Sequence, residues 1–334
     1  LKKTVRWVVG IVLGVYIGTI VLLNIPNIQQ AMSVFVAEEL SEVLNTKVVI
    51  GRINMGLLNR IIIDDVLLDD QSGQEMLKVT RLSAKFDIMP FFKGKISISS
   101  VQLFGFNINL RKETPDSPPN FKFVLDAFAS KDTVKKENSL DLRINSILIR
   151  RGRMSYHVLS EEETPGKFNA KHIQLQNIIA NISLKALSKD SLNLGIKRLS
   201  LDEKASGFSL KKMSLKLVAN NKQTNIDNFT IELPETSLKL DTIHLEYDSL
   251  KAFDRFTEQV HFSFRTLPSQ VTLKDISPFV PILSHFKEPV TLDMEVKGTV
   301  DQLTCSHLEI TADDRQFRLR GDVSLQDLSR PQDA

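Results

Sequence analysis

The first strong pattern along the chain is an uncharged apolar run, WVVGIVLGVYIGTIVLLNI, over residues 7–25. Nineteen residues in a helix span about 28 Å, which matches the hydrocarbon core of a bilayer. The run predicts a membrane-spanning helix, so that residues 1–26 comprise a short cytoplasmic stub and a signal anchor. The anchor residues that we single out are Trp7, Ile11, Leu13, Tyr16, Ile20 and Leu22.

Basic residues flank this run on one side. Lys2, Lys3 and Arg6 precede it, and the next basic residue is Lys47. The positive-inside rule then places the N-terminus in the cytoplasm and the rest of the chain across the membrane. A cleaved signal peptide is the alternative, but the run exceeds the usual apolar core of ~7–15 residues and no small-residue cleavage site follows it.

Residues 27–46 change to a helical period. Apolar side chains from Ile28 to Leu44 share one stripe, and Glu38 and Glu42 lie away from it. An acidic polar face disfavours binding to anionic lipid. We therefore expect an amphipathic helix that caps the end of a sheet.

From Lys47 onward the period becomes two, which predicts a mainly β body over residues 47–334. Leu82 and Phe86 alternate with polar residues, and Phe104, Phe106 and Ile108 continue the pattern on the next strand. The earlier strand candidates are residues 47–55, 60–69, 76–88, 95–110, 140–150, 153–159 and 168–180. A slip of the alternation just before Phe104 predicts a bulge, because bulges bend long strands.

Two segments interrupt the strands. Residues 121–130 are expected to form a short helix, and residues 274–286 a helical or turn segment, because Pro278 and Pro281 exclude a ladder strand. Strands resume afterwards up to the final residues, as in the alternating Leu292, Met294 and Val296. We expect the sheet to continue in a longer natural protein.

The strands outnumber the helices so strongly that the apolar face of the sheet lacks a helical cover. Large contiguous apolar patches are rare on soluble monomers. A second sheet layer, closure into a barrel, or a curled sheet with a hydrophobic ligand on its concave face would each resolve this. An immunoglobulin-like sandwich lacks its cysteine and tryptophan signature here. A membrane barrel normally carries aromatic girdles, whereas this chain has 1 Trp and 3 Tyr.

Composition narrows the function further. Without the three basic residues at the N-terminus, acidic and basic residues balance, so the body has no basic excess for binding nucleic acid. The single cysteine, Cys305, cannot form an intrachain disulfide.

We find no motif of a catalytic, metal or cofactor site. The six histidines are scattered, and no Walker, G-x-S-x-G or H-E-x-x-H segment occurs. The pairs Asp64-Asp65 and Asp69-Asp70 lack the spacing of a calcium loop, so we expect them to be solvated turn carboxylates. We assign no catalytic residue, no metal and no cofactor, which makes an enzyme on a membrane stalk the least favoured class.

Residues 48–110 carry a linked set of motifs. The set comprises Val49-Ile50-Gly51, the strand ending Asp65-Val66-Leu67-Leu68-Asp69, a turn at Gly73, Pro90-Phe91-Phe92-Lys93-Gly94, Ile96-Ser97-Ile98 and Phe104-Gly105-Phe106. Together with the preceding anchor and helix, this set resembles the N-terminal region of the AsmA-like family. Two later stretches, Arg151-Gly152-Arg153-Met154-Ser155-Tyr156 and Asp275-Ile276-Ser277-Pro278-Phe279, are also similar to that family.

The resemblance implies an elongated, curled, antiparallel-type β-sheet with an open hydrophobic groove. It implies a Gram-negative inner-membrane protein with a periplasmic body that carries phospholipids toward the outer membrane. The expected partners are phospholipids and the inner membrane, with no nucleic acid. The groove residues that we select are Leu82, Phe86, Phe104, Phe106, Ile108, Leu292, Met294 and Val296.

A scaffold or chaperone for outer-membrane β-barrel proteins is the alternative that stays open. Such a protein would guide β-chains by strand addition at an open sheet edge. The resemblance implies that it would act with an outer-membrane barrel assembly factor (TamA-like) through a C-terminal region that this sequence lacks.

Overall fold

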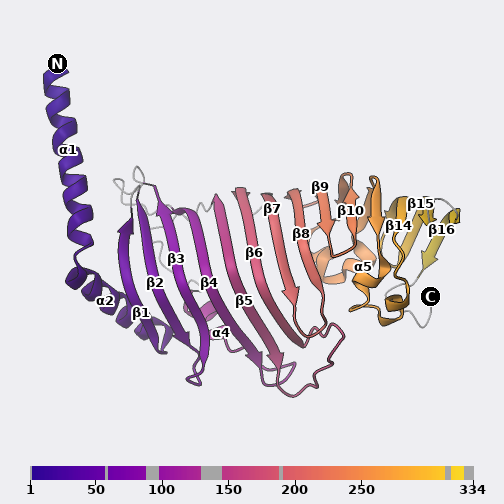
Figure 1. The fold of residues 1–334 in the computed structure, drawn as a ribbon, viewed down its shortest axis with the longest axis horizontal. Coiled ribbons are helices and arrows are strands. Elements are labelled where there is room, and N and C mark those ends of the chain that lie inside the picture. The colour runs from indigo at the N-terminus through magenta and orange to yellow at the C-terminus, as the bar shows by residue number, and fades with distance from the viewer. Residues whose placement is uncertain are drawn as a thin grey trace. The chain divides into compact units, whose positions relative to one another are not determined.

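The computed structural model describes residues 2–56, 59–87, 98–128, 145–187, 191–312 and 317–326. The chain divides into two compact units, Leu1–Glu162 and Glu163–Ala334. With 56% of residues in strands and 21% in helices, the chain is mainly β, as the period of two predicts (Figure 1).

The first unit begins with two helices, α1 over Lys2–Leu23 and α2 over Pro26–Leu44. Pro26 opens α2, where its missing N–H costs nothing, and Asn45 ends it in the left-handed conformation with φ 49°. The predicted amphipathic helix is therefore confirmed to within two residues. Among the described residues, no helix on its own has the length and apolarity of a membrane span. Leu13–Leu23 and Pro26–Leu44 meet that criterion together, as a pair bent by 72°.

The sheet of the first unit follows the chain order. It contains β1 (Val48–Gly56), β2 (Arg60–Asp69), β3 (Glu75–Phe86), β4 (Ile98–Lys112) and β5 (Ser146–Val158). Neighbours from β1 to β4 are antiparallel, but β4 and β5 are parallel. The prediction of a purely antiparallel sheet is therefore wrong. The chain makes a long crossover through α4 (Lys122–Phe128), and this returns β5 in the direction of β4.

Several sequence-based bounds also change. The two strands expected at residues 140–150 and 153–159 are the single strand β5, and residues 140–144 lie outside the described part. The predicted helix at residues 121–130 is confirmed as α4 over the residues that are described. Residues 88–97, which include the predicted end of one strand and start of the next, are not described.

A row of kinked residues crosses the first sheet. Asp65, Gly105 and Arg151 have positive φ angles of 56°, 65° and 55° and lie at corresponding positions on β2, β4 and β5. On β4 and β3, the pairs flanking Gly105 match one residue to one residue, so no extra residue is inserted. The slip near Phe104 is thus real, but its cause is a left-handed residue and not the predicted bulge. Apolar residues three apart, such as Ile50 and Ile53, consequently join one core cluster.

The second unit begins with four long strands joined in sequence order. They are β6 (His172–Leu187), β7 (Ser191–Glu203), β8 (Ser209–Asn220) and β9 (Gln223–Glu232), and each pairs antiparallel with the next. The strand predicted from residue 168 therefore starts four residues later.

Beyond β9 the next two rows of the sheet are broken. One half of β9 pairs with β10 (Ser237–Leu240) and the other half with β11 (Ile243–Glu246). β14 (Val290–Gly298) likewise pairs with β13 (Ser269–Val271) and β12 (His261–Arg265). β15 (Gln302–Ala312) and β16 (Phe317–Gln326) then extend the sheet.

Short helical turns fill the interruptions. η1 (Leu250–Arg255) and α5 (Phe256–Gln259) follow β11, and η2 (Leu273–Ile276) and η3 (Pro281–His285) follow β13. The non-strand segment predicted at residues 274–286 is therefore confirmed. Figure 1 shows α5 beside the short orange strands.

Candidate functional site: an uncovered apolar sheet face

Apolar side chains align across all five strands of the first unit. The cross-strand register brings together the rows Ile61–Ala84–Val101–Ile147, Ile63–Leu82–Leu103–Ile149, Val66–Val79–Phe106 and Leu68–Leu77–Ile108–Met154. These rows define the unit 1 apolar face. Cross-strand apolar pairs on one face are the main source of sheet stability.

Helical cover on this face is confined to one end. α2 packs on β1, where Leu44 joins Val48, Ile50 and Leu68 in a buried cluster. Farther along, Leu82, Leu103 and other face residues are half-buried. Side chains that neighbour one another but have no layer above them show this intermediate exposure. Among the described elements, α2 on β1 is the one extensive helix–strand packing, so most of the face is uncovered.

The structure separates the groove residues selected on the first unit. Leu82 and Ile108 are half-buried on the apolar face, whereas Phe106 is 8% exposed and belongs to its packed part. Phe86 pairs with Ile98 at a register shift, next to residues that are not described.

Phe104 does not share the face of Phe106. It pairs with Arg81 and Arg150, is 38% exposed, and has the Arg151 guanidinium 5.1 Å from its ring centroid. The left-handed Gly105 between the two phenylalanines reverses the alternation. The prediction that Phe104 lines the apolar face is therefore wrong for a stated backbone reason, and a cation–π contact on the polar face replaces that role.

The second unit has its own apolar face. Its rows include Leu194–Leu217–Ile226–Ile243, Phe264–Val296–Cys305–Val323 and Leu292–Ile310–Leu319. These and the adjoining apolar positions define the unit 2 apolar face. Leu292 and Met294 are half-buried on β14, and Val296 is 3% exposed, so all three selected residues of this strand lie on it. Cover is present where Tyr247, Ala252 and Val260 pack together beside η1.

The opposite sides of both sheets are polar. Arg81 Nε lies 2.6 Å from Asp64 Oδ1 in the first unit, and Lys212 Nζ lies 3.1 Å from Glu232 Oε1 in the second. Glu309 on β15 receives Arg318 and Arg320 from β16, and these arginines lower its pKa, most strongly through the Arg320 hydrogen bond. Such exposed pairs suit a solvated surface. Each sheet is thus apolar on one side and hydrated on the other.

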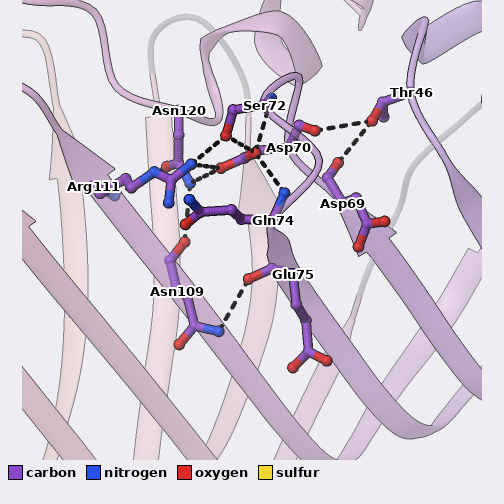
Figure 2. Close-up of polar contacts among 9 residues, drawn as sticks. All are labelled: Thr46, Asp69, Asp70, Ser72, Gln74, Glu75, Asn109, Arg111 and Asn120. Atoms are coloured by element: carbon purple, nitrogen blue, oxygen red, sulfur yellow. Dashed lines mark hydrogen bonds and ion pairs between the residues drawn. The ribbon is translucent and has the colours of Figure 1, made fainter.

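A polar network at the β2–β3 turn was missed by the sequence reasoning. Asp70, expected to be a solvated turn carboxylate, is 2% exposed. Figure 2 shows its Oδ1 accepting hydrogen bonds from Ser72 and from the Gln74 N–H, and its Oδ2 meeting Asn120 and, at 2.7 Å, Arg111. The surroundings consist of donors and a cation, so they suit a carboxylate and not a calcium ion. The prediction is therefore wrong for Asp70.

Burial and hydrogen bonding oppose each other at Asp70. Burial raises the pKa of this carboxyl, but hydrogen bonds from Ser72, Gln74 and Asn120 outweigh it and leave the pKa below its ordinary value. Beside the network is a cavity of about 630 Å³, lined by the ends of α2 and β4, the β2–β3 turn and α4. Its charged residues of opposite sign pair with one another, as Lys122 does with Asp126 at 2.6 Å.

The anchor residues lie on α1. Trp7, Ile11, Leu13 and Leu22 are exposed, at 75%, 62%, 54% and 53%, and Tyr16 and Ile20 are half-buried. A helix whose large apolar side chains are bare has an unsatisfied hydrophobic surface. No known protein family, curated protein or solved structure matches this chain.

Proposed function

We propose that this chain is a membrane-anchored, bridge-like protein that carries phospholipids along the apolar faces of its sheets. Acyl chains would lie on the half-buried aliphatic and aromatic residues, and the headgroups would stay in water. Contact with these faces removes apolar surface of both lipid and protein from water, which is worth roughly 25 cal/mol per Å².

The observation that carries the proposal is the one-sided character of both sheets. Rows of four apolar residues, such as Leu68–Leu77–Ile108–Met154, cross several strands with little helical cover. An uncovered apolar area of this kind marks a binding surface. Its length along the strands suits a long flexible hydrocarbon chain better than a compact ligand.

The topology of the proposal rests on the N-terminal helices. α1 would cross the inner membrane of a Gram-negative cell once, with the N-terminus in the cytoplasm and the sheets in the periplasm. The resemblance of residues 48–110 to the AsmA-like family supports this placement and the lipid cargo. A curled sheet would then form the groove along which lipid moves toward the outer membrane.

Site-specific photo-crosslinking tests the proposal. A benzophenone side chain at Ile108 or Met294, both half-buried on the apolar faces, should capture phospholipid in cells that make the full chain. The matched controls are Lys78 and Thr291, which are exposed on the opposite sides of β3 and β14. Equal capture at both sets, or capture of protein alone at the apolar positions, would refute the conduit.

A scaffold for outer-membrane β-chains is the second candidate, and the edge strand β16 favours it. Among the described strands, β16 pairs with β15 alone, and its Phe317, Leu319 and Leu325 are 55%, 47% and 39% exposed. An open strand can accept another by β-augmentation. Crosslinks from Leu319 to an unfolded barrel protein, with no lipid at Met294, would favour this function.

A further inference from the structure

The turn segment formed by residues 279–286 of the second unit exposes four large apolar side chains. Phe279, Val280, Ile282 and Phe286 are 46%, 46%, 70% and 54% exposed. Within fewer than ten residues, this is a dense apolar surface on a part of the chain that forms no strand. We call it the apolar turn segment.

Specific contacts hold the segment in place. The Phe279 ring lies 4.8 Å from the ring of Phe168 and 5.0 Å from that of Phe208, measured between centroids. The Phe168 N–H donates to the Pro278 carbonyl at 2.8 Å, and the Lys274 N–H donates to the Phe286 carbonyl at 3.1 Å. The exposed side chains are therefore presented by a fixed turn and not by a frayed end.

The segment is continuous with the unit 2 apolar face. Leu201 pairs with Leu210 on that face, and Phe208 precedes Leu210 by two residues in extended backbone, so both side chains share one side of the sheet. Phe279 contacts Phe208 directly. The apolar surface thus passes from the ends of β7 and β8 onto the turn segment without a polar break.

The chemistry of the segment identifies its occupant. Pro281 begins the 3₁₀ turn η3, and its missing N–H together with the turned backbone prevents pairing with an incoming β-strand. The exposed lysines Lys274 and Lys287 close the two ends of the apolar stretch, where they could meet anionic groups. An amphiphile with a hydrocarbon tail and a phosphate headgroup fits this arrangement, whereas an unfolded β-chain does not.

We propose that the apolar turn segment is a second acyl-chain contact, placed where the unit 2 apolar face ends. This inference rests on the proposed lipid-carrying function. It assigns Ile282 and Phe286 to the hydrocarbon chain and Lys287 to the phosphate side of the same lipid.

The test compares benzophenone crosslinking at Ile282, Met294 and Thr291 in cells that make the full chain. We expect Ile282 and Met294 to capture phospholipid and Thr291 to capture little. Ile282→Asp should lower lipid recovered from a crosslinker at Phe286 by about tenfold, the loss typical of replacing a large apolar contact with a charge. Ser284→Asp, an equal charge on the same exposed turn, is the matched control.

Each outcome decides between the two proposals. Capture at Met294 without capture at Ile282 overturns the second contact and leaves the conduit intact. Capture of a protein at Ile282, whether a partner or another copy of this chain, also overturns it. Absence of lipid at both positions overturns the conduit and the inference together. Because Ile282 is 70% exposed, the thermal transition of Ile282→Asp should equal that of the parent, which separates lost binding from lost folding.

Discussion

The side-chain amide of Gln29 joins α1, α2 and the sheet. Its Nε2 donates to Asn54 Oδ1 at 2.6 Å and to Asn24 Oδ1 at 3.2 Å, while Asn24 Nδ2 donates to the Met55 carbonyl at 2.9 Å. Gln29 is 7% exposed, so these bonds are largely shielded from water. The end of α1 is therefore fixed to β1 by a buried polar contact as well as by packing.

Removing this amide should destabilise the first unit. Gln29→Met keeps the volume of the side chain but leaves the oxygen of Asn54 without this donor, which we expect to cost about 1–3 kcal/mol. Chemical denaturation of the soluble part that follows α1 would miss the contact to Asn24, so the full chain in detergent should be measured.

Gln30→Met provides the control for that variant. Gln30 is the exposed neighbour on the same helix, and its replacement should change the free energy of unfolding by less than about 0.5 kcal/mol. Equal effects of the two substitutions would show that the Gln29 contact does not stabilise the protein.

Gly105 occupies a backbone position that an alanine cannot adopt without strain. Its φ is +65°, and an added Cβ would lie 2.7 Å from Thr80 Oγ1 and 3.1 Å from Thr80 Cβ. We expect Gly105→Ala to destabilise the first unit by about 1–3 kcal/mol, measured by thermal or chemical unfolding.

Gly321→Ala is the matched comparison within a strand. Its added Cβ meets nothing within 4 Å, and its φ is not in the left-handed region. That substitution should be neutral or slightly stabilising. A stable Gly105→Ala variant would mean that the kinked row is not needed for the sheet.

The strand pattern was predictable because burial on one side imposes a period of two that sequence displays directly. β2 has the predicted bounds, and β1 begins one residue later than expected. The parallel pairing of β4 and β5 left a signal that was not used, namely a crossover of more than 30 residues with a helix inside it. Long crossovers favour parallel neighbours.

The site was harder to predict because its details depend on distant partners. Asp70 is buried by Asn120, 50 residues later, and no local motif encodes that contact. Phe104 lies in an alternating stretch, and the left-handed Gly105 that moves it to the polar face is not visible in hydrophobicity. Glycine in a strand was the available clue, since it often marks an irregularity.

Acid should weaken the two buried carboxylates that close turns. Asp70 and Glu203 are 2% and 3% exposed, and hydrogen bonds outweigh burial at both, so both pKa values lie below the ordinary values of 3.8 and 4.5. A lowered folded-state pKa means that the stability it confers is present above the ordinary value and is lost as the pH falls through the folded-state value.

Asp70→Asn and Glu203→Gln should therefore reduce the steepness with which stability falls at acidic pH. Unfolding measured from pH 7 down to below the ordinary carboxyl pKa would show this, because fewer carboxylates then bind protons on unfolding. Asp116→Asn, at an exposed loop position, should leave the slope unchanged. Parallel pH curves for all variants would contradict the assignment.

Phe104 and Ile108 allow the apolar face to be tested against the polar face on a single strand. Ile108 pairs with Leu77 and Met154 on the apolar face, and Phe104 meets Arg151 on the other side. Ile108→Asp places a charge where acyl chains would lie, so lipid transfer should fall by at least about tenfold. Phe104→Asp should leave transfer near the parent level, because an exposed carboxylate can pair with Arg151.

Lipid flux must be compared with the thermal transition of the same variants. If Ile108→Asp lost transfer only in proportion to folded protein, the apolar face would be a structural core. If Phe104→Asp blocked transfer while remaining folded, the lipid path would run along the side that carries the arginines. Loss of flux at Ile108 with retained folding, and retained flux at Phe104, is the combination that the one-sided sheet requires.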